Sequence, residues 1–284
     1  MSLPALAAPD YLLIGHVTRD LLPAGERPGG TVTYAGLTAA AWGLAVAAVT
    51  SCAAEISLRE LAALRLFRLP AEHTTTFENR YHGSIREQFI HQVAMRLTLA
   101  AVPLEWRSPR IVHLAPVADE VDLALIARFP QSLVGVTPQG WLRAWDGDGR
   151  VQRREPSPEL LAALRAASAC VFSVEDVGGN EHLIAQLVEA CPITAVTESA
   201  RGARVYWNGH VRNMPAAHAI LRDPTGAGDV FAACFFARLS ETRDPFEAGR
   251  AATLLATASV EGEGLAGIPT REAIARSRLV VERP

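Results

Sequence analysis

The sequence predicts an α/β protein in which helices cover both faces of a mostly parallel sheet. Three observations indicate this class: short apolar runs of strand length, segments of helical periodicity between them, and enough apolar residues, 49% of 284, to fill a large core. The expected strands are 11–16, 44–50, 110–115, 132–137, 169–174 and 193–197. The expected helices between them are 35–43, 57–66, 119–129, 157–167 and 181–190.

Two segments interrupt this alternation. Residues 74–94 alternate apolar with polar side chains around a His-Gly-Ser turn, which favours an antiparallel hairpin, and with residues 20–33 they could form a small separate sheet. The second segment, 203–214, contains Asn208-Gly209, the preferred dipeptide of a two-residue hairpin turn, and is expected at an edge of the main sheet.

The last part of the chain is expected to be helical, at 227–239, 245–260 and 270–278. No repeat or linker divides the sequence. We therefore expect a single domain spanning residues 1–284, with lid segments at about 18–34 and 73–94.

Composition excludes several classes of function. The 30 acidic and 27 basic residues give a net charge of −3, which suggests neither a nucleic-acid nor a membrane partner and favours a small-molecule role. All 27 basic residues are arginines, so chemistry that needs a lysine, such as a Schiff base, a pyridoxal-phosphate lysine or a Walker A lysine, is excluded.

The sequence shows no sign of export, membrane insertion or zinc binding. Its start lacks a signal-peptide pattern, and the longest apolar stretch, 39–54, is too short to span a membrane, so a cytoplasmic location is expected. The four cysteines, 52, 170, 191 and 234, form no C-x-x-C pair and are expected in the core. No two histidines have the spacing of a helical zinc site.

The stretch DPTGAGD at 223–229 carries the strongest chemical signal. Gly226 and Gly228 come just before an apolar helix, where glycines allow backbone N–H groups to point at an anion such as phosphate. A carboxylate among those donors would repel the anion, so Asp229 needs a task of its own. We expect Asp229 to accept the proton of an alcohol that attacks the phosphate.

Residues 223–231, DPTGAGDVF, resemble the D-T-x-G-A-G-D-x-F signature of the ribokinase-like (PfkB) carbohydrate kinases, with Pro224 in the usual threonine position. Residues 15–20 followed by Gly29-Gly30 resemble the N-terminal substrate motif of that family, and AVTESARGARVY at 195–206 resembles its nucleotide-binding strand and loop. The resemblance covers about residues 11–278. It implies a three-layer ribokinase-like fold with a small antiparallel β lid, and ATP-dependent phosphorylation of a hydroxyl on a small sugar, nucleoside or cyclitol.

The resemblance also implies residue roles. Asp229 would be the general base, and the amides of Gly226, Ala227 and Gly228 would form an anion hole for the transferring phosphate. Asp20, Gly29 and Gly30 would contact the hydroxyls of the acceptor. The remaining implied positions are Thr197, Ser199 and Gly202 along the nucleotide, Glu175 of an N-x-x-E motif near Mg²⁺, and Asp223 and Thr225 at a site for a monovalent cation such as K⁺.

The sequence departs from the family pattern at two further positions. The asparagine expected after the N-terminal glycines is Tyr34, which favours a polyol other than ribose as the acceptor, and the asparagine of N-x-x-E is Phe172. Arginine must supply any cationic contact to the phosphates; the candidates are Arg201, Arg204 and Arg222, with Arg86 on the lid reaching the acceptor. Gln139, in the segment TPQGWLR, is expected at the same mouth.

Other interpretations of the sequence are weaker. GEGLAG at 262–267 matches the dinucleotide pattern G-x-G-x-x-G but follows a helix instead of a strand, and GERPGGTV at 25–32 lacks the P-loop lysine. The serious alternative is a non-catalytic sensor that binds a sugar or nucleotide on the same fold. A base within an anion hole argues against a pure binder. The expected assembly is a monomer or a homodimer through the lid.

Overall fold

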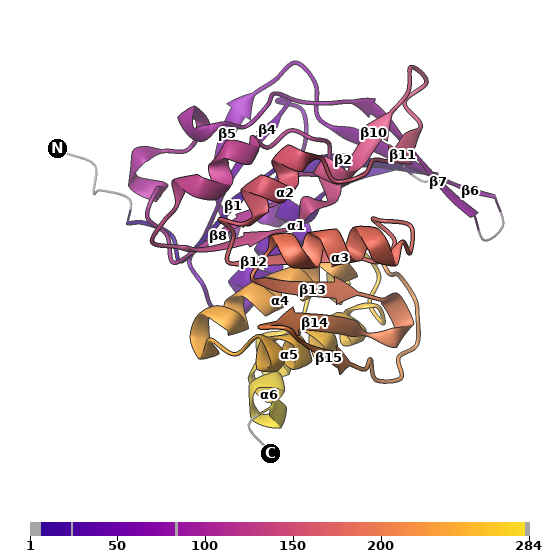
Figure 1. The fold of residues 1–284 in the computed structure, drawn as a ribbon. Coiled ribbons are helices and arrows are strands. Elements are labelled where there is room, and N and C mark those ends of the chain that lie inside the picture. Colours follow the sequence, from indigo (N-terminus) through magenta and orange to yellow (C-terminus); the bar gives the residue numbers. More distant parts are fainter. Residues whose placement is uncertain (1–6, 24, 83–84, 282–284) are drawn as a thin grey trace.

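The fold is built around one large twisted sheet (Figure 1). The computed structural model describes residues 7–23, 25–82 and 85–281. The sheet has nine strands in the order β15-β14-β13-β12-β9-β8-β1-β4-β5. Their bounds, in chain order, are β1 (Tyr11–Ile14), β4 (Val46–Cys52), β5 (Arg65–Pro70), β8 (Ile111–Leu114), β9 (Leu133–Val136), β12 (Ala169–Ser173), β13 (Ile193–Thr197), β14 (Ala203–Trp207) and β15 (His210–Met214).

Seven of the nine strands are parallel; the six that continuous apolar runs predict are largely buried, whereas the seventh, β5, is a partly exposed edge strand. Strands β14 and β15 form the expected antiparallel hairpin at one edge. Asn208 and Gly209 both have positive φ in its turn, at 50° and 74°. The prediction of an edge hairpin at 203–214 is therefore confirmed.

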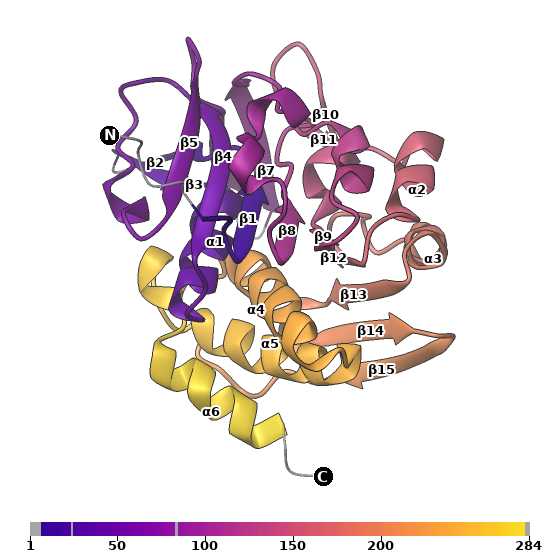
Figure 2. The same cartoon turned by 90° about the vertical axis from the view of Figure 1, so that its left-hand side faces the viewer.

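Helices cover both faces of the sheet and form two apolar cores. One face carries α1 (Thr31–Ala41), α4 (Ala227–Thr242), α5 (Pro245–Ser259) and α6 (Arg271–Val281), which Figure 2 shows together. The other carries α2 (Pro158–Leu164) and α3 (Glu181–Ala190), with 3₁₀ turns at Leu99–Ala101, Leu104–Trp106 and Leu123–Arg128. The arrangement is the three-layer α/β fold expected from the sequence.

Two expected helices are different in the structure. Residues 57–66 form a short 3₁₀ turn, Arg59–Leu61, and then enter edge strand β5. The leucines of this segment have the spacing of a helix, but Leu61 and Leu64 are buried beneath α1. Leu64 fills the space that a side chain at Gly36 would occupy. Residues 119–129 form a 3₁₀ helix, Leu123–Arg128, capped by the side chain of Asp122.

A second sheet stands apart from the first, in the order β3-β2-β6-β7. Its strands are β2 (Thr18–Leu22), β3 (Gly25–Gly29), β6 (Thr76–His82) and β7 (Ile85–Gln92), which come from the two segments expected to form a lid. The expected antiparallel pairing holds for β2–β3 and β6–β7, whereas β2 and β6 run parallel. We refer to these four strands as the lid sheet. A small antiparallel sheet of β10 (Arg143–Trp145) and β11 (Val151–Arg153) lies beside β7, where Ile90 N–H donates to the carbonyl of Gly149 at 2.8 Å.

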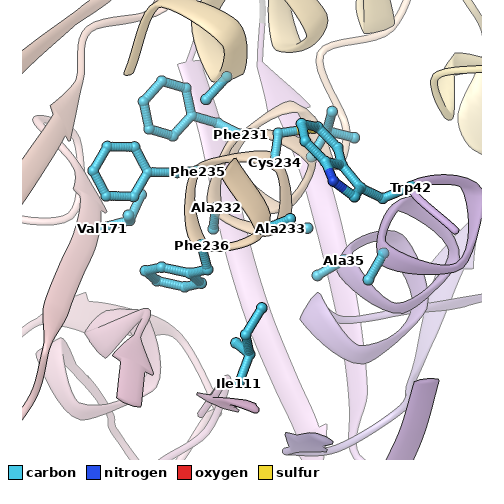
Figure 3. Close-up of a cluster of buried hydrophobic side chains, with 14 of the residues drawn as sticks. Ala35, Trp42, Ile111, Val171, Phe231, Ala232, Ala233, Cys234, Phe235 and Phe236 are labelled. Atoms are coloured by element: carbon cyan, nitrogen blue, oxygen red, sulfur yellow. The ribbon is translucent and has the colours of Figure 1, made fainter. Parts of the chain in front are cut away.

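Helix α4 lies at the centre of the larger core (Figure 3). Phe236 is fully buried, with its ring edge-on to His113 at a centroid distance of 5.0 Å and to Phe235 at 6.0 Å. On the sheet, Gly135 leaves the room that this ring needs, since a Cβ there would lie 2.7 Å from it. The packing of Phe236 therefore fixes the height of α4, and with it the helix N-terminus, above the sheet.

Replacing Phe236 with Leu should lower the free energy of unfolding by about 1–2 kcal/mol, because ring contacts are lost and a small cavity remains. Urea denaturation measures this change. Phe67→Leu is the matched control, since Phe67 lies on edge strand β5 with 43% of its surface exposed. An equal loss in the two variants would show that the packing of Phe236 has no special importance.

The four cysteines are buried and free, in agreement with their expected place in the core. Among the described residues, no helix is both long and apolar enough to cross a membrane. Within the same ranges, no group of three or more His, Cys, Asp or Glu side chains could hold a metal ion.

Candidate active site

The N-terminus of α4 forms an open turn of backbone amides. Gly226 caps the helix with φ 80° and ψ −3°, a left-handed conformation that favours glycine. The amide of Ala227 donates to the Pro224 carbonyl at 3.2 Å, whereas the amides of Gly226 and Gly228 have no partner in the described part of the chain. A Cβ at Gly228 would meet nothing within 4 Å. Residues 223–228, which we call the anion turn, thus offer free N–H groups beside open space at the positive end of a helix.

Asp229 lies in the first turn of α4, half-buried. Burial raises its pKa to about 6, although a hydrogen bond from Thr31 and the positive charge of Arg143 oppose the rise. Asp176 and Asp20 add negative charge nearby and raise it further. A carboxylate with a pKa near 6 is ionised at neutral pH and is a better base than an ordinary aspartate.

Helix α1 begins beside the same turn. Thr31, its first residue, holds the Asp229 carboxylate by a hydrogen bond. One turn further on, Tyr34 lies against the anion turn so closely that a Cβ at Gly226 would overlap its ring. The N-termini of two helices therefore meet at Asp229.

The tyrosine that replaces the expected asparagine has an unusual environment. Tyr34 is 2% exposed, and its hydroxyl has no hydrogen-bond partner among the described residues. Burial raises its pKa to about 12, with Arg27, Asp20, Asp223 and Asp229 close enough to influence it. A buried hydroxyl without a partner is costly, so a ligand that supplies one would be favoured.

The structure brings the predicted N-terminal motif to this point. Asp20, on β2, accepts a hydrogen bond from the Thr18 hydroxyl at 2.8 Å. A side chain at Gly29 would overlap the Asp20 carboxylate, and a Cβ at Gly30, where φ is 80°, would lie 2.6 Å from the His16 carbonyl. The two glycines are thus needed for the close approach of β3 and α1 to β2.

Two residues that the sequence analysis did not assign also reach the site. Arg143, at the start of β10, donates to the Val117 carbonyl at 3.1 Å, lies over the Phe77 ring of the lid sheet at 5.6 Å, and acts electrostatically on both Asp229 and Asp176. Burial raises the pKa of Asp176, which accepts from the Ser173 amide at 2.8 Å. The segment TPQGWLR, which includes Arg143, was the available signal in the sequence.

Gln139, expected at the mouth of the site, lies on the 3₁₀ turn Pro138–Leu142 beside Asp176. Its side-chain amide donates to Asp176 at 3.4 Å. Arg86 lies on β7 opposite Tyr81, and its side chain falls outside the described part of the structure.

The expected nucleotide residues form a separate group at the ends of β12 and β13. Ser199, with φ 52°, donates its hydroxyl to Glu175 at 3.1 Å, and Thr197 Oγ1 lies 3.5 Å from the Phe172 carbonyl. A Cβ at Gly202 would overlap the Met214 carbonyl, so this glycine is explained by the approach of β15. Glu175 is exposed and does not face Asp229, whereas its neighbour Asp176 does.

The three arginines expected near the phosphates differ in their surroundings. Arg204 is held by Glu198 at 2.8 Å and Glu181 at 2.9 Å, and Arg201 is exposed, 3.5 Å from Glu198. Arg222 is exposed and donates its backbone amide to the Val260 carbonyl. Arg143 is thus the cation that acts on Asp229.

The sequence is similar to those of known kinases. Residues 159–271 match the model of the pfkB family carbohydrate kinases. A cytidine kinase of Thermococcus kodakarensis is 26% identical over 257 residues, covering 82% of this chain and 90% of that protein. An inositol 3-kinase of Zea mays is 35% identical over 104 residues, covering 37% of this chain and 27% of that protein.

Solved structures share the fold over nearly the whole chain. A pyrophosphate-dependent kinase in the ribokinase family, complexed with a pyrophosphate analog and myo-inositol, superimposes with a TM-score of 0.78 at 20% identity, covering 94% of this chain and 99% of that one. Ribokinase from Thermotoga maritima superimposes with a TM-score of 0.71 at 18% identity, covering 94% of this chain and 98% of that one. The signature loop thus lies within the segment, residues 159–271, that matches the model of the pfkB family carbohydrate kinases, and the chain shares the ribokinase-like fold with the solved kinases.

Proposed function

We propose that this kinase transfers the γ-phosphoryl group of Mg-ATP to a hydroxyl of a small polyol, with Asp229 as the general base. The observation that carries the proposal is a carboxylate with a pKa near 6 beside free backbone amides at a helix N-terminus. The amides of Gly226 and Gly228 would stabilise negative charge on the transferring phosphate, while Asp229 takes the proton from the attacking hydroxyl.

One acidic residue at the end of β12 fits a magnesium ion bound beside Asp229. Mg²⁺ is usually held by one or two carboxylates together with substrate phosphates, and Asp176, which acts electrostatically on Asp229, would supply one of them. When bound, Mg²⁺ neutralises charge on the donor phosphates. Arg143 lies on the side of the site where the lid sheet approaches, and would contact the transferring group from there.

The acceptor would lie between the lid sheet and Asp229. Asp20 is held by Thr18 for hydrogen bonding to acceptor hydroxyls, and Tyr34 offers a buried hydroxyl that has no partner within the described ranges. The phenol is larger than the family asparagine and has a single polar atom, which favours a nucleoside or cyclitol over free ribose. Arg86 would approach the acceptor from β7, and Thr197, Ser199 and Gly202 would line the nucleotide.

An acceptor panel tests the proposal. Donor consumption should be measured with cytidine, myo-inositol, ribose and fructose, using Mg-ATP and Mg-pyrophosphate as separate donors because solved neighbours use pyrophosphate. We expect turnover with Mg-ATP and one class of acceptor. Binding of donor and acceptor by thermal shift without turnover would favour a sensor, and turnover with pyrophosphate alone would contradict the proposed donor.

The pH dependence of kcat/KM should show an acidic limb near pH 6. Activity is lost as the pH falls through the pKa of Asp229, because the protonated carboxyl cannot accept the proton of the acceptor. Arg143→Gln should move the limb to higher pH, since Arg143 favours the ionised form. Arg150→Gln, which removes an arginine paired with Glu87 outside the site, is the control that should not move it. An acidic limb near pH 4 would contradict the assignment.

A further inference from the structure

An arginine from the lid sheet reaches the start of the anion turn. Arg27, on β3, places a guanidinium nitrogen 3.5 Å from Oδ2 of Asp223. Both side chains are shielded, with 27% and 16% of their surfaces exposed. The pair therefore joins the lid sheet to the loop that presents Gly226 and Gly228.

The same carboxylate gathers a third segment. Oδ1 of Asp223 accepts the Thr225 amide at 2.9 Å, and Oδ2 accepts the amide of Gly264 at 3.0 Å. Burial would raise the pKa of Asp223, but hydrogen bonds from Thr225 and Gly264 and the charge of Arg27 hold it below the usual value. The loop 262–267, which carries the G-x-G-x-x-G pattern, is thus a structural partner of the anion turn.

This arrangement does not fit a monovalent cation held by Asp223 and Thr225. The Thr225 hydroxyl hydrogen-bonds to Asp223. The guanidinium also approaches Gly264, where a Cβ would lie 3.1 Å from one of its nitrogens. A K⁺ ion bound to the same carboxylate would lie close to this fixed positive charge, and the two positive charges would repel each other.

The charge of Arg27 also reaches the inner side of the anion turn. Arg27 is the cation that acts on Tyr34, and the Tyr34 ring lies directly against Gly226. Arg27, Tyr34 and Asp223 therefore surround the turn from the side of the lid sheet. Loss of the guanidinium would leave a shielded carboxylate without its cation at the base of the anion hole.

We propose that Arg27 is a built-in cation that orders the anion turn through Asp223, so that this kinase needs no monovalent cation. Arg27 is a positioning residue: it acts on the phosphate site through Asp223 and the amides that follow it. Because it belongs to β3, the same contact ties the lid sheet to the anion turn. The effect on turnover rests on the proposed function, whereas the effect on ion binding does not.

Thermal unfolding without substrates tests the ion claim directly. Wild-type protein should melt at the same temperature in potassium chloride and in tetramethylammonium chloride of equal ionic strength. Arg27→Met keeps much of the apolar stem but removes the charge, so its melting temperature should become sensitive to K⁺. A K⁺-specific rise in the wild-type melting temperature would overturn the proposal. The melting temperature can be measured even if no acceptor is found. Failure of the ion claim can therefore be distinguished from failure of the proposed function.

Kinetics with the identified acceptor tests the positioning role. Arg27→Met should lower kcat by about tenfold or more, because a misplaced anion-hole donor stabilises the transferring phosphate less well. Added guanidinium or K⁺ should restore part of this activity, since either ion can replace the missing positive charge. Arg27→Lys should keep most of the turnover and stay insensitive to K⁺. Arg80→Ala, which removes a lid arginine paired with Glu78, is the control and should leave kcat unchanged. Full turnover by Arg27→Met in tetramethylammonium would refute the role of Arg27.

Discussion

Replacing Asp229 with Asn should lower kcat by about a thousandfold while changing the affinity for the phosphoryl donor little. The substitution keeps the shape of the side chain and the opportunity to bond Thr31 but removes the group that accepts a proton, which typically contributes 10²–10⁴ in rate, about 4 kcal/mol at the middle of this range. Asp229 is half-buried, held by Thr31, and next to free amides, so no neighbouring carboxylate has the same position. Initial rates and donor binding by calorimetry measure the two effects. A variant that keeps a tenth or more of the activity would contradict the assignment.

The stability of the same variant provides an independent check. Because the pKa of Asp229 rises from 3.8 to about 6 on folding, its ionised form is disfavoured in the folded protein. This destabilisation is fully present above pH 6 and disappears as the pH falls towards 3.8. Asp229→Asn should therefore be more stable than wild type near pH 8, by about 1–2 kcal/mol after allowance for partial exposure. The advantage should shrink on acidification.

Replacing Gly226 with Ala should lower both stability and turnover. The residue has φ 80°, which costs an L-residue about 1–2 kcal/mol, and its new Cβ would overlap the Tyr34 ring. Tyr34 is buried, so either its ring or the anion turn must move, with a total expected loss of about 2–3 kcal/mol in unfolding free energy. The displaced amides should lower kcat by about a hundredfold.

Two further glycines separate these effects. Gly209→Ala adds a side chain at φ 74° in a hairpin turn with nothing within 4 Å, so it measures the backbone cost alone. Gly228→Ala adds a Cβ to open space beside the anion turn, so it should leave the melting temperature unchanged and still lower turnover. If Gly226→Ala lost no more stability than Gly209→Ala, the contact with Tyr34 would be unimportant.

The regular elements were largely predictable because their signals are local. Continuous apolar runs specify parallel strands, and Asn208-Gly209 specifies the edge hairpin. Strand β5 was missed because the leucines near Leu61 repeat with helical spacing although they pack beneath α1. Strand-to-strand direction was less predictable: the parallel contact of β2 with β6 depends on the path of the chain between them.

The site was predictable where motif and backbone coincide, and less so where distant side chains meet. The anion turn, Asp229, Asp20 and the two N-terminal glycines lie together as expected. Arg143 and Arg27 were missed because sequence alone does not show which of 27 arginines a turn or a lid strand directs into the site. Glu175 and Asp176 are adjacent in the turn after β12, but their side chains have different partners: Glu175 accepts from Ser199, and Asp176 accepts from the Ser173 amide. The conformation of the folded backbone decides this difference, so the sequence does not show it.

Transfer of labelled phosphate is the most direct measurement of the central claim. The protein should be incubated with ATP labelled at the γ-phosphate, Mg²⁺ and the acceptor found in the panel, and the label followed through a single turnover. We predict that the label appears as a phosphate ester of the acceptor with wild-type protein and stays on ATP with Asp229→Asn. Label released only as inorganic phosphate, or equal transfer by both proteins, would contradict the proposed kinase mechanism.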